Sequence, residues 1–388
     1  MAHTQTDLQM MRRALALAEN GVGFTAPNPV VGCVIAKAGR IVGEGWHQGH
    51  RWHPKKGRAH AEVEALRQAG DAATGATAYV TLEPCNHTGK TSPCATALIR
   101  AGITRVVIAA EDPNPTAAGG IATLRTAGIT VETGLCADEA LAQTRAWRHQ
   151  IGTGRPHVVA KFAASLDGKI ATHTGDSQWI TGPAARQRSH DLRQMADAII
   201  VGAQTVMSDN PALTVRDREL PSHPLRVVLD STARTSPMAK VFHGPGRALL
   251  VITDKTPAER LAAFEAMDVD ILRTQSNIDG RIDLKPLLNH LTSLGTTTAM
   301  VEGGSSLLGS FFDAGLIDEV WAFLAPMIIG GGKNAFGGTG AASLTEALHL
   351  DHIQTEQVER DILIRGQVRH QSKATPAHQE EASLCSQA

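Results

Sequence analysis

Short apolar runs alternate with amphipathic stretches along the first 150 residues. In the amphipathic stretches, apolar residues recur every three or four positions, which is the spacing of one helix face, whereas the short runs are typical of buried strands. A first helix is expected with Asp7 as its N-cap and Gly21 just past its end. Two apolar runs in 30–42 flank a Lys-Ala-Gly turn and predict a β-hairpin. The strand–helix alternation that follows predicts a three-layer α/β domain with a mostly parallel sheet.

The pattern restarts after a Gly- and Pro-containing segment at 152–156. Apolar runs then alternate again with helical stretches, and several of these runs look like strands of a parallel sheet. A chain of 388 residues is also too long for one ordinary core, so two domains are expected. We therefore divide the chain into residues 1–150 and 151–370. The remaining residues, 371–388, are polar and small, which predicts a disordered tail.

Composition and charge narrow the class of protein. The chain is 42% hydrophobic and 19% charged, with a net charge of −1, so it lacks the basic excess expected of a nucleic-acid-binding protein. No apolar run approaches the length of a membrane span, and the first residues lack the apolar core of a signal peptide. Five cysteines do not suggest a disulfide framework. We expect a cytoplasmic protein that binds neither nucleic acid nor membrane.

One stretch carries a candidate metal site. His60 is followed closely by Glu62, and Cys85 and Cys94 each follow a proline, with eight residues between the two cysteines. One imidazole and two thiolates suit Zn²⁺ with a fourth position left open for water, which is the arrangement of a catalytic site. Glu62 is then placed to move protons without binding the metal, as in the zinc deaminases.

Both halves of this motif are expected to open helices. A helix N-terminus carries partial positive charge and favours thiolate over thiol, which suits ligands that converge on a metal. The alternative is a structural zinc site with four protein ligands, in which His87 completes the set.

The second half contains two glycine-rich segments of a kind that often binds ligands. VEGGSS places glycines and hydroxyls between a strand and a helix N-terminus, as in phosphate-binding turns, and IIGGGK adds a loop with a cation. No G-x-G-x-x-G follows the first strand, so the usual dinucleotide fingerprint is absent. Lys161 and Asp167 lie where a cleft is expected, but the sequence assigns them no role. These residues alone indicate a phosphate-binding α/β domain.

The motifs together resemble one family. HAE with TLEPC and a second Pro-Cys is similar to the deaminase half of the RibD family of bifunctional riboflavin-biosynthesis enzymes. KFAASLDGK, SQWITG, DNPALTVR and VEGG resemble the reductase half of that family, which has a dihydrofolate-reductase-like fold and uses NADPH. The resemblance extends from about residue 7 to about residue 369.

The resemblance implies two consecutive reactions on small pyrimidine ribose phosphates. The first is the zinc-dependent hydrolytic deamination of 2,5-diamino-6-(5-phosphoribosylamino)pyrimidin-4-one. In the second, NADPH reduces the ribose of 5-amino-6-(5-phosphoribosylamino)uracil to a ribityl chain. The family also implies a homodimer or larger homo-oligomer.

The resemblance also implies site residues. In the deaminase half, Asn28, held between two prolines, is expected to line the substrate pocket. Substrate contacts of the reductase half are expected from Ser177, Arg193, Leu213, Arg216 and Glu302, and the two arginines can grip a ribose phosphate with paired donors. Cofactor contacts are expected from Ala163, Trp179, Thr205, Asp209, Ser231 and a turn from Gly304 to Ser310 that includes Ser305 and Ser306.

Three other functions compete with this interpretation. A nucleoside or nucleic-acid deaminase with an unrelated partner domain conflicts with the long cysteine spacing and the neutral charge. A chain with one degenerate domain conflicts with the motif residues that both halves keep. A zinc-stabilised module that senses a nucleotide requires a fourth protein ligand and predicts no turnover.

Overall fold

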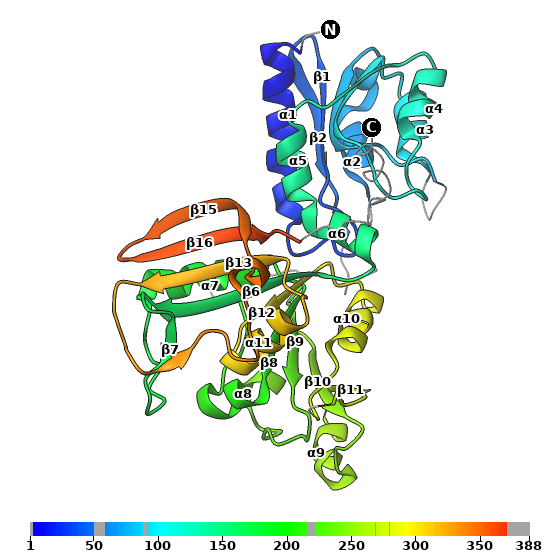
Figure 1. The fold of residues 1–388 in the computed structure, drawn as a ribbon. Coiled ribbons are helices and arrows are strands. Elements are labelled where there is room, and N and C mark those ends of the chain that lie inside the picture. Colours follow the sequence, from blue (N-terminus) through cyan, green and yellow to red (C-terminus); the bar gives the residue numbers. More distant parts are fainter. Residues whose placement is uncertain are drawn as a thin grey trace, which may run out of the picture.

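The computed structural model describes residues 3–49, 59–87, 92–215, 222–267, 269–278 and 280–370 (Figure 1). Two β-sheets organise these residues, one of five strands and one of nine, together with a two-stranded ribbon. The predicted α/β fold class is confirmed for both halves of the chain. The predicted tail, 371–388, lies outside the described residues. No helix in the described ranges is long and apolar enough to cross a membrane.

The first sheet has the strand order β2-β1-β3-β4-β5. Its strands are β1 (Gly32–Lys37), β2 (Arg40–Trp46), β3 (Thr77–Leu82), β4 (Arg105–Ala110) and β5 (Thr130–Thr133). The helices around it are α1 (Gln5–Ala18), α2 (Ala61–Ala69), α3 (Cys94–Arg100), α4 (Gly120–Thr126) and α5 (Ala137–Gln143), with short 3₁₀ turns at Glu19–Gly21 and Gly70–Ala73.

Alternation of side chains along these strands produces two separate cores. One face packs Val34, Tyr79 and Val107 against α1 and α5. The opposite face packs residues such as Ile35 and Ile108 against α2, α3 and α4. Figure 1 shows the sheet between these two helical layers, so the expected three-layer arrangement is confirmed.

Two details of the first half correct the sequence predictions. The sheet is mixed rather than mostly parallel, because β1 pairs antiparallel with both β2 and β3 and only the β3–β4 and β4–β5 pairs are parallel. The N-cap of α1 is Thr4 and not Asp7. Asp7 instead closes a capping box, in which its side chain accepts a hydrogen bond from the backbone of Thr4.

Two glycines of β2 set the position of α2. A Cβ atom on Gly43 would lie 2.1 Å from the carbonyl oxygen of Ala65, and one on Gly45 would lie 2.3 Å from that of Ala61. Larger side chains at these positions would therefore push the helix away from the sheet. The close approach fixes where α2 begins, and the first half of the metal motif lies there.

The second sheet has the strand order β11-β10-β9-β8-β12-β6-β13-β16-β15. Every pairing from β11 to β13 is parallel, and β16 and β15 complete the edge as antiparallel strands. The strands are β6 (His157–Ser165), β8 (Ala198–Gly202), β9 (Leu225–Leu229), β10 (Ala248–Thr253), β11 (Asp270–Thr274), β12 (Thr298–Val301), β13 (Glu319–Ala325), β15 (Leu350–Val358) and β16 (Asp361–Val368). The two-stranded ribbon pairs β7 (Lys169–Ala171) with β14 (Lys333–Asn334).

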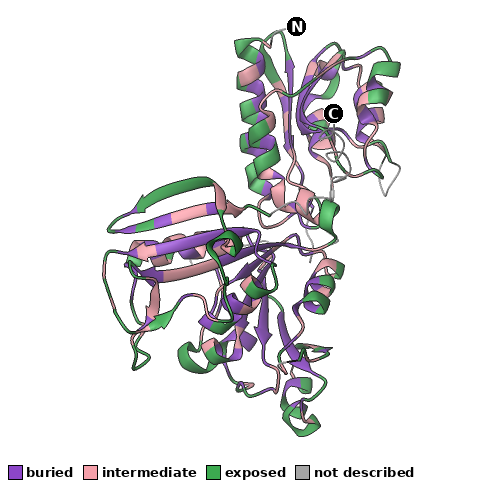
Figure 2. Cartoon of the chain, in the orientation of Figure 1, coloured by how far each residue is buried: buried purple, intermediate pink, exposed green. Residues whose placement is uncertain are grey.

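Helices cover both faces of the second sheet. One apolar cluster joins the sheet to α7 (Pro183–Gln194), α8 (Ala203–Asp209) and α9 (Ala262–Glu265). The other joins it to α10 (Leu284–Ser293) and α11 (Ser305–Asp313). Figure 2 shows that the central strands are buried while β15 at the edge is mostly exposed. Helix α6 (Arg145–Thr153) precedes β6 and connects the two halves.

Candidate active sites

The residues His60, Cys85 and Cys94 meet at one point of the first half. The His60 Nδ1 atom lies 3.5 Å from the Cys85 sulfur and 3.2 Å from the Cys94 sulfur. All three donor atoms lie within 4.8 Å of one another, and this is the group in the described residues that could hold a metal ion. His87 is exposed and does not belong to the group, so the described residues supply no fourth ligand.

Two helix starts and one strand end bring these residues together. His60 is the N-cap of α2, Cys94 is the first residue of α3, and Cys85 follows β3 in the segment Glu83–Pro84–Cys85. The backbone N–H of Cys94 donates to the Cys85 sulfur at 3.5 Å. A helix N-terminus therefore points at one thiolate, as the sequence led us to expect.

Glu83 holds the segment that carries Cys85. Its buried carboxylate accepts hydrogen bonds from the backbone of Gly119 and Ile121 at 3.0 Å and from Asp112 at 3.2 Å. These contacts tie the end of β3 to the start of α4. The sequence reasoning did not single out this residue, because its partners follow it by about 30 residues or more.

The ligand set fits zinc. Tetrahedral zinc with ordinary bond lengths holds its nitrogen and sulfur ligands about 3.6 Å apart. The nitrogen–sulfur distances of 3.5 and 3.2 Å are close to this value. Two sulfurs and one imidazole are also ligands that zinc favours, and three protein ligands leave a position open.

The protonation of the ligands is coupled. The Cys94 thiol and the His60 ring lower the pKa of Cys85 to about 4, whereas the Cys85 sulfur and burial raise the pKa of Cys94. The Cys85 thiolate also raises the pKa of His60. One thiolate therefore forms more readily than the other, and metal binding at this set would release protons.

Glu62 lies in the first turn of α2, beside the metal-ligand cluster. It is the second residue of α2, it is 3% exposed, and its carboxyl group neighbours Cys94. Burial raises the pKa of Glu62, and the nearby His60 partly opposes this effect. A buried carboxyl group with a raised pKa beside a metal site is suited to take up and release a proton during a reaction.

One residue, His47, connects Asn28 with the metal-ligand cluster. Its side-chain nitrogen lies 3.2 Å from Nε2 of His47, and the His47 ring packs edge-on against the His60 ring with centroids 5.3 Å apart. Asn28 is itself exposed. Asn28 is therefore linked to His60 through the His47 ring.

Most of the predicted cofactor residues of the second half lie at the same end of the second sheet. They lie at or just past the carboxyl ends of neighbouring parallel strands, where open α/β sheets bind their ligands. Gly304 caps α11, and a Cβ atom on it would lie 3.4 Å from Thr205 Oγ1, so the turns after β12 and β8 touch. The set comprises Ala163 on β6, Gly304, Ser305 and Ser306 after β12, Thr205 and Asp209 on α8 after β8, and Ser231 after β9.

Three largely buried charged side chains form a cluster near the carboxyl ends of these strands. Arg193 on α7 donates two hydrogen bonds to the Glu302 carboxylate, at 2.6 and 2.7 Å. Lys161 Nζ on β6 lies 3.9 Å from the same carboxylate. Burial raises the pKa of Glu302, but the Arg193 and Lys161 charges outweigh it and hold the pKa at about 2. Burial lowers the pKa of Lys161.

The other predicted substrate residues of this half are placed as follows. Leu213 is buried and precedes Thr214, whose carbonyl oxygen accepts a hydrogen bond from Arg193 at 3.3 Å. Ser177 is half-buried in the segment before α7. Arg216 lies outside the described residues. Of the cofactor set, Trp179 is 63% exposed, and the Arg186 guanidinium stacks on its ring at 4.4 Å.

The structure gives Asp167 a definite environment that the sequence did not reveal. Its carboxylate accepts hydrogen bonds from the Ser165 hydroxyl and from the backbone of Ile329 and Gly330. The glycine loop IIGGGK is therefore tied to the turn after β6. Its position is determined by a side chain about 160 residues earlier in the chain.

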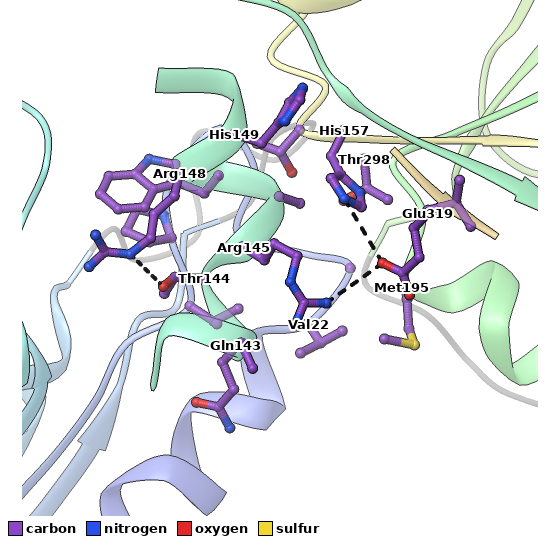
Figure 3. Close-up of a pocket in the computed structure, with 18 of the residues that line it drawn as sticks. Val22, Gln143, Thr144, Arg145, Arg148, His149, His157, Met195, Thr298 and Glu319 are labelled. Atoms are coloured by element: carbon purple, nitrogen blue, oxygen red, sulfur yellow. Dashed lines mark hydrogen bonds and ion pairs between the residues drawn. The ribbon is translucent and has the colours of Figure 1, made fainter. Parts of the chain in front are cut away.

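A cavity of about 1380 Å³ lies between the two halves (Figure 3). Three of its lining residues face one another, with Arg145 at 3.7 Å and His157 at 3.9 Å from the Glu319 carboxylate. Of the predicted site residues, Asn28 lines this cavity. The metal-ligand cluster and the Arg193–Glu302 pair are not in its lining.

Two family models match separate parts of the chain. The model for the cytidine and deoxycytidylate deaminase zinc-binding region matches residues 4–110, and the model for the RibD C-terminal domain matches residues 156–364. The first match contains the metal-ligand cluster, and the second contains the buried charge cluster.

Relatives match nearly the whole chain. The riboflavin biosynthesis protein RibD of Actinobacillus pleuropneumoniae is 42% identical over 367 residues, which cover 93% of this chain and 95% of the relative. The protein of the same name from Escherichia coli K12 is 42% identical over 337 residues, covering 84% and 89% of the two chains.

Solved structures agree with these matches. Acinetobacter baumannii RibD superposes with a TM-score of 0.82 at 37% identity, covering 94% of this chain and 99% of that one. A diaminohydroxyphosphoribosylaminopyrimidine deaminase/5-amino-6-(5-phosphoribosylamino)uracil reductase from Thermotoga maritima superposes with a TM-score of 0.81 at 33% identity, with the same coverage.

Proposed function

Because this chain belongs to the RibD family of bifunctional deaminase and reductase enzymes of riboflavin biosynthesis, we propose which of its residues carry each reaction. The first half would deaminate 2,5-diamino-6-(5-phosphoribosylamino)pyrimidin-4-one. The second half would reduce the ribose of the resulting 5-amino-6-(5-phosphoribosylamino)uracil. The observation that carries the first assignment is the cluster of His60, Cys85 and Cys94 beside the buried Glu62.

In the deaminase half, His60, Cys85 and Cys94 would hold zinc. When bound, zinc supplies a water of lowered pKa as the nucleophile for the amine-bearing ring carbon. Glu62 takes a proton from the attacking water and passes it to the ring nitrogen. It then helps the amine leave as ammonia. Asn28 presents an amide donor and acceptor to the pyrimidine ring, and its neighbour His47 supports this orientation.

In the reductase half, NADPH would supply the hydride. The turn from Gly304 to Ser306 at the start of α11 would bind a phosphate of the cofactor through its backbone N–H groups and hydroxyls. Ala163, Trp179, Thr205, Asp209 and Ser231 complete the proposed cofactor contacts. Ser177, Arg193, Leu213, Arg216 and Glu302 are the proposed substrate contacts.

The charge cluster suggests how the reductase substrate is held. Glu302 stays ionised because Arg193 and Lys161 face it, so its carboxylate can accept hydrogen bonds from ribose hydroxyls. Arg193 offers further donors to a ribose phosphate. Lys161, which the sequence left without a role, joins the proposed substrate pocket on this ground.

We place the division between the two catalytic domains at residue 150, with residues 151–370 forming the reductase. The family matches end at 110 and begin at 156, on either side of α6, which supports this division. We also propose that the protein acts in the cytoplasm as a homodimer or larger homo-oligomer.

A two-part assay tests the proposal. Zinc-loaded protein would be given the diaminopyrimidinone ribose phosphate, and ammonia release would be followed first, then NADPH oxidation after deamination. Both signals are expected in that order. Ammonia without NADPH oxidation would contradict the assignment of the second half. Neither signal from a protein that holds zinc tightly would favour a zinc-stabilised binding module instead.

A further inference from the structure

The IIGGGK stretch contains none of the proposed contacts of the two reactions. It belongs to residues 327–335, the glycine segment, which follow β13 and include the ribbon strand β14. Strands β13 and β6 pair in parallel, so the segment begins beside the carboxyl end of β6. Most of the proposed cofactor contacts lie at this same end of the sheet. The glycine segment is therefore close to the reductase site, although it supplies none of its proposed contacts.

Asp167 ties the glycine segment to the turn after β6. Its Oδ1 atom accepts a hydrogen bond from the Ser165 hydroxyl at 2.6 Å and another from the backbone N–H of Ile329 at 3.1 Å. Its Oδ2 atom accepts from the backbone N–H of Gly330 at 2.9 Å. The Ser165 hydroxyl, together with these backbone donors, lowers the pKa of Asp167 to about 2. The carboxylate is therefore ionised at neutral pH, and its hydrogen bonds are charge-assisted.

Backbone contacts hold the two ends of the glycine segment. The N–H of Leu166 donates to the carbonyl oxygen of Met327 at 2.8 Å, and the N–H of Ala335 donates to that of Gly168 at 3.0 Å. Asp167 fixes the part between these ends. A change of the Asp167 side chain would thus leave the end contacts in place and loosen the middle of the segment.

Two glycines of the segment suit this geometry. Gly330, whose N–H reaches Asp167, has a φ of +80°, a conformation that favours glycine. A Cβ atom on Gly332 would lie 2.1 Å from the carbonyl oxygen of Ala171 on β7, so a larger residue would push the segment away from the ribbon. Contacts with the loop after β6 therefore account for these glycines without a bound phosphate.

The loop after β6 carries two of the proposed reductase contacts. It leads from Asp167 through β7 to Ser177, a proposed substrate contact, and Trp179, a proposed cofactor contact. Just past β7, the backbone N–H of Thr172 donates to the carbonyl oxygen of Asp176 at 2.8 Å, and the Thr172 hydroxyl accepts from the Asp176 N–H at 3.1 Å. Asp176 directly precedes Ser177, so the ribbon determines where this stretch begins.

Two anchors hold residues 177–181. The first is the β7–β14 ribbon, in which Lys169 Nζ also donates to Asn334 Oδ1 at 2.6 Å. The second follows Trp179, where the backbone N–H of Gly182 donates to the buried Asp361 at 2.6 Å. The second anchor is independent of the glycine segment, whereas the first depends on it.

We propose that Asp167 is a positioning residue of the reductase. Through the glycine segment and the β7–β14 ribbon, it sets the position of Ser177 and Trp179 relative to the bound substrate and NADPH. Without this tie, residues 177–181 gain freedom at one end, and reaction rates are sensitive to displacements of about 1 Å. This inference rests on the proposed reductase function.

Single-turnover kinetics on the full-length chain test this role. The protein, in excess over substrate, would first deaminate the diaminopyrimidinone ribose phosphate to completion without NADPH, and would then be mixed rapidly with saturating NADPH. Asp167→Ala should reduce the rate constant of NADPH oxidation about tenfold or more. This rate constant does not depend on the fraction of active protein, so a loss of folded protein alone would leave it unchanged.

Asp167→Asn gives a graded version of the test. Asparagine keeps one oxygen that can accept from Ser165 and Ile329, but its amide nitrogen cannot accept from Gly330. The rate constant should therefore lie between those of the wild type and Asp167→Ala. The Kd for NADPH, measured by calorimetry, should rise less than about threefold in both variants, because most proposed cofactor contacts lie on other turns. Ammonia release and the midpoint of urea unfolding should stay at wild-type values.

Asp313→Ala is the matched control. Asp313 is also exposed, and its carboxylate accepts from two consecutive backbone N–H groups, those of Thr339 and Gly340, at 2.8 and 3.0 Å. These residues continue the chain just past the glycine segment. Asp313 ends α11, whereas the proposed cofactor turn lies at the start of that helix. Its substitution should leave the rate constant and the Kd for NADPH unchanged.

The outcomes separate this inference from the function on which it rests. Wild-type protein that oxidises NADPH, with Asp167→Ala at the same rate constant, would overturn the positioning role alone. Equal losses in Asp167→Ala and Asp313→Ala would overturn it as well. If Asp167→Ala does not fold, the rate constant of Asp167→Asn decides in the same way. Wild-type protein that releases ammonia but never oxidises NADPH would overturn the reductase proposal and this inference together.

Discussion

The metal-ligand cluster joins residues that are 25 and 34 positions apart in the chain, whereas the Arg193–Glu302 pair joins residues 109 positions apart. The first site is assembled from one strand end and two helix starts that follow one another in sequence. The second is assembled across a parallel sheet, where neighbouring strands come from distant parts of the chain. The first site therefore depends on neighbouring elements of the chain, and the second depends on contacts between distant ones.

The two sites also differ in the charges that surround their buried glutamates. Glu62 is buried beside His60, Cys85 and Cys94, and burial raises its pKa. Glu302 is buried against Arg193 and Lys161, which keep it ionised. In the first site, burial favours the uncharged form of the carboxyl group, and the nearby His60 only partly opposes this effect. In the second site, removing one partner leaves another charge buried, so chemistry and stability are coupled there.

The largest expected effect is on deamination. Glu62→Gln keeps the shape of the side chain but removes its ability to carry a proton. Ammonia release should fall by about 10²–10⁴-fold, the usual contribution of a positioned acid–base group. Zinc content, the midpoint of urea unfolding and NADPH-dependent reduction should remain at wild-type values. Metal analysis, urea titration and separate assays of the two reactions would measure these quantities.

Glu64→Gln provides the control for that experiment. Glu64 lies on the same helix and pairs with Arg67 at 3.0 Å on the surface. Its substitution should leave ammonia release unchanged. A Glu62→Gln enzyme with near-normal ammonia release would remove Glu62 from the proton-transfer role.

At the reductase site, one substitution is expected to lower both the stability of the protein and its reductase activity, by a smaller factor than the effect on deamination. Arg193→Gln removes both hydrogen bonds to Glu302 and leaves a buried carboxylate with Lys161 as its remaining cation. The free energy of unfolding should fall by about 3–5 kcal/mol, as it does when one partner of a buried ion pair is removed. Reduction should fall at the same time. Urea unfolding and NADPH oxidation would measure the two losses.

Arg188→Gln tests whether the burial of the Arg193–Glu302 pair causes the predicted loss of stability. Arg188 lies on the same helix and pairs with the exposed Glu356 at 3.0 Å. Its substitution should cost about 0–1 kcal/mol of stability, as for surface ion pairs. Equal losses for the two arginines would contradict the view that the reductase site couples charge to stability.

The third expected effect is a pH dependence that belongs to the second site. The pKa of Glu302 is held at about 2, below its ordinary value of 4.5, so its stabilising contribution is complete above pH 4.5. It should be lost progressively as the pH falls from 4.5 towards 2. The free energy of unfolding should therefore decline less steeply over this range in Glu302→Gln than in the wild type. Parallel declines in the two proteins would show that Glu302 does not titrate in this way.

The sequence indicated which residues meet in the metal-ligand cluster, because these residues are close together in the chain. A His, a nearby Glu and two Pro-Cys pairs carry their own spacing, and the helix starts at His60 and Cys94 could be read from local patterns. The pairing of β1 could not. A hairpin pattern shows that β1 pairs with β2, but nothing local shows that β1 also pairs antiparallel with β3.

The second site shows what local patterns leave out. Lys161 and Asp167 received no role from the sequence, because their partners, Glu302 and the Ile329–Gly330 backbone, lie more than 100 residues away. The strands β15 and β16 were not predicted either. β15 is a mostly exposed edge strand, so it lacks the apolar run that marks a buried strand.

The smallest expected effect concerns a feature remote from both sites. Thr4 caps α1, where its hydroxyl accepts a hydrogen bond from the Asp7 backbone at 3.1 Å while Asp7 also accepts from Arg105 and Tyr79. Thr4→Ala should lower the free energy of unfolding by about 1 kcal/mol, the usual cost of losing an N-cap. Urea unfolding would measure this loss, and Thr4→Ser should restore most of it because serine caps equally well.

Neither reaction should respond to Thr4→Ala, because α1 packs on the face of the first sheet opposite to α2 and α3, whose starts carry His60 and Cys94. The variant therefore tests whether the metal-ligand cluster depends less on the rest of its domain than the charge cluster does. A site assembled from consecutive elements should tolerate a small loss of stability in the layer behind it. If ammonia release from folded Thr4→Ala protein fell several-fold, the metal-ligand cluster would depend on the whole domain, much as the charge cluster depends on its sheet.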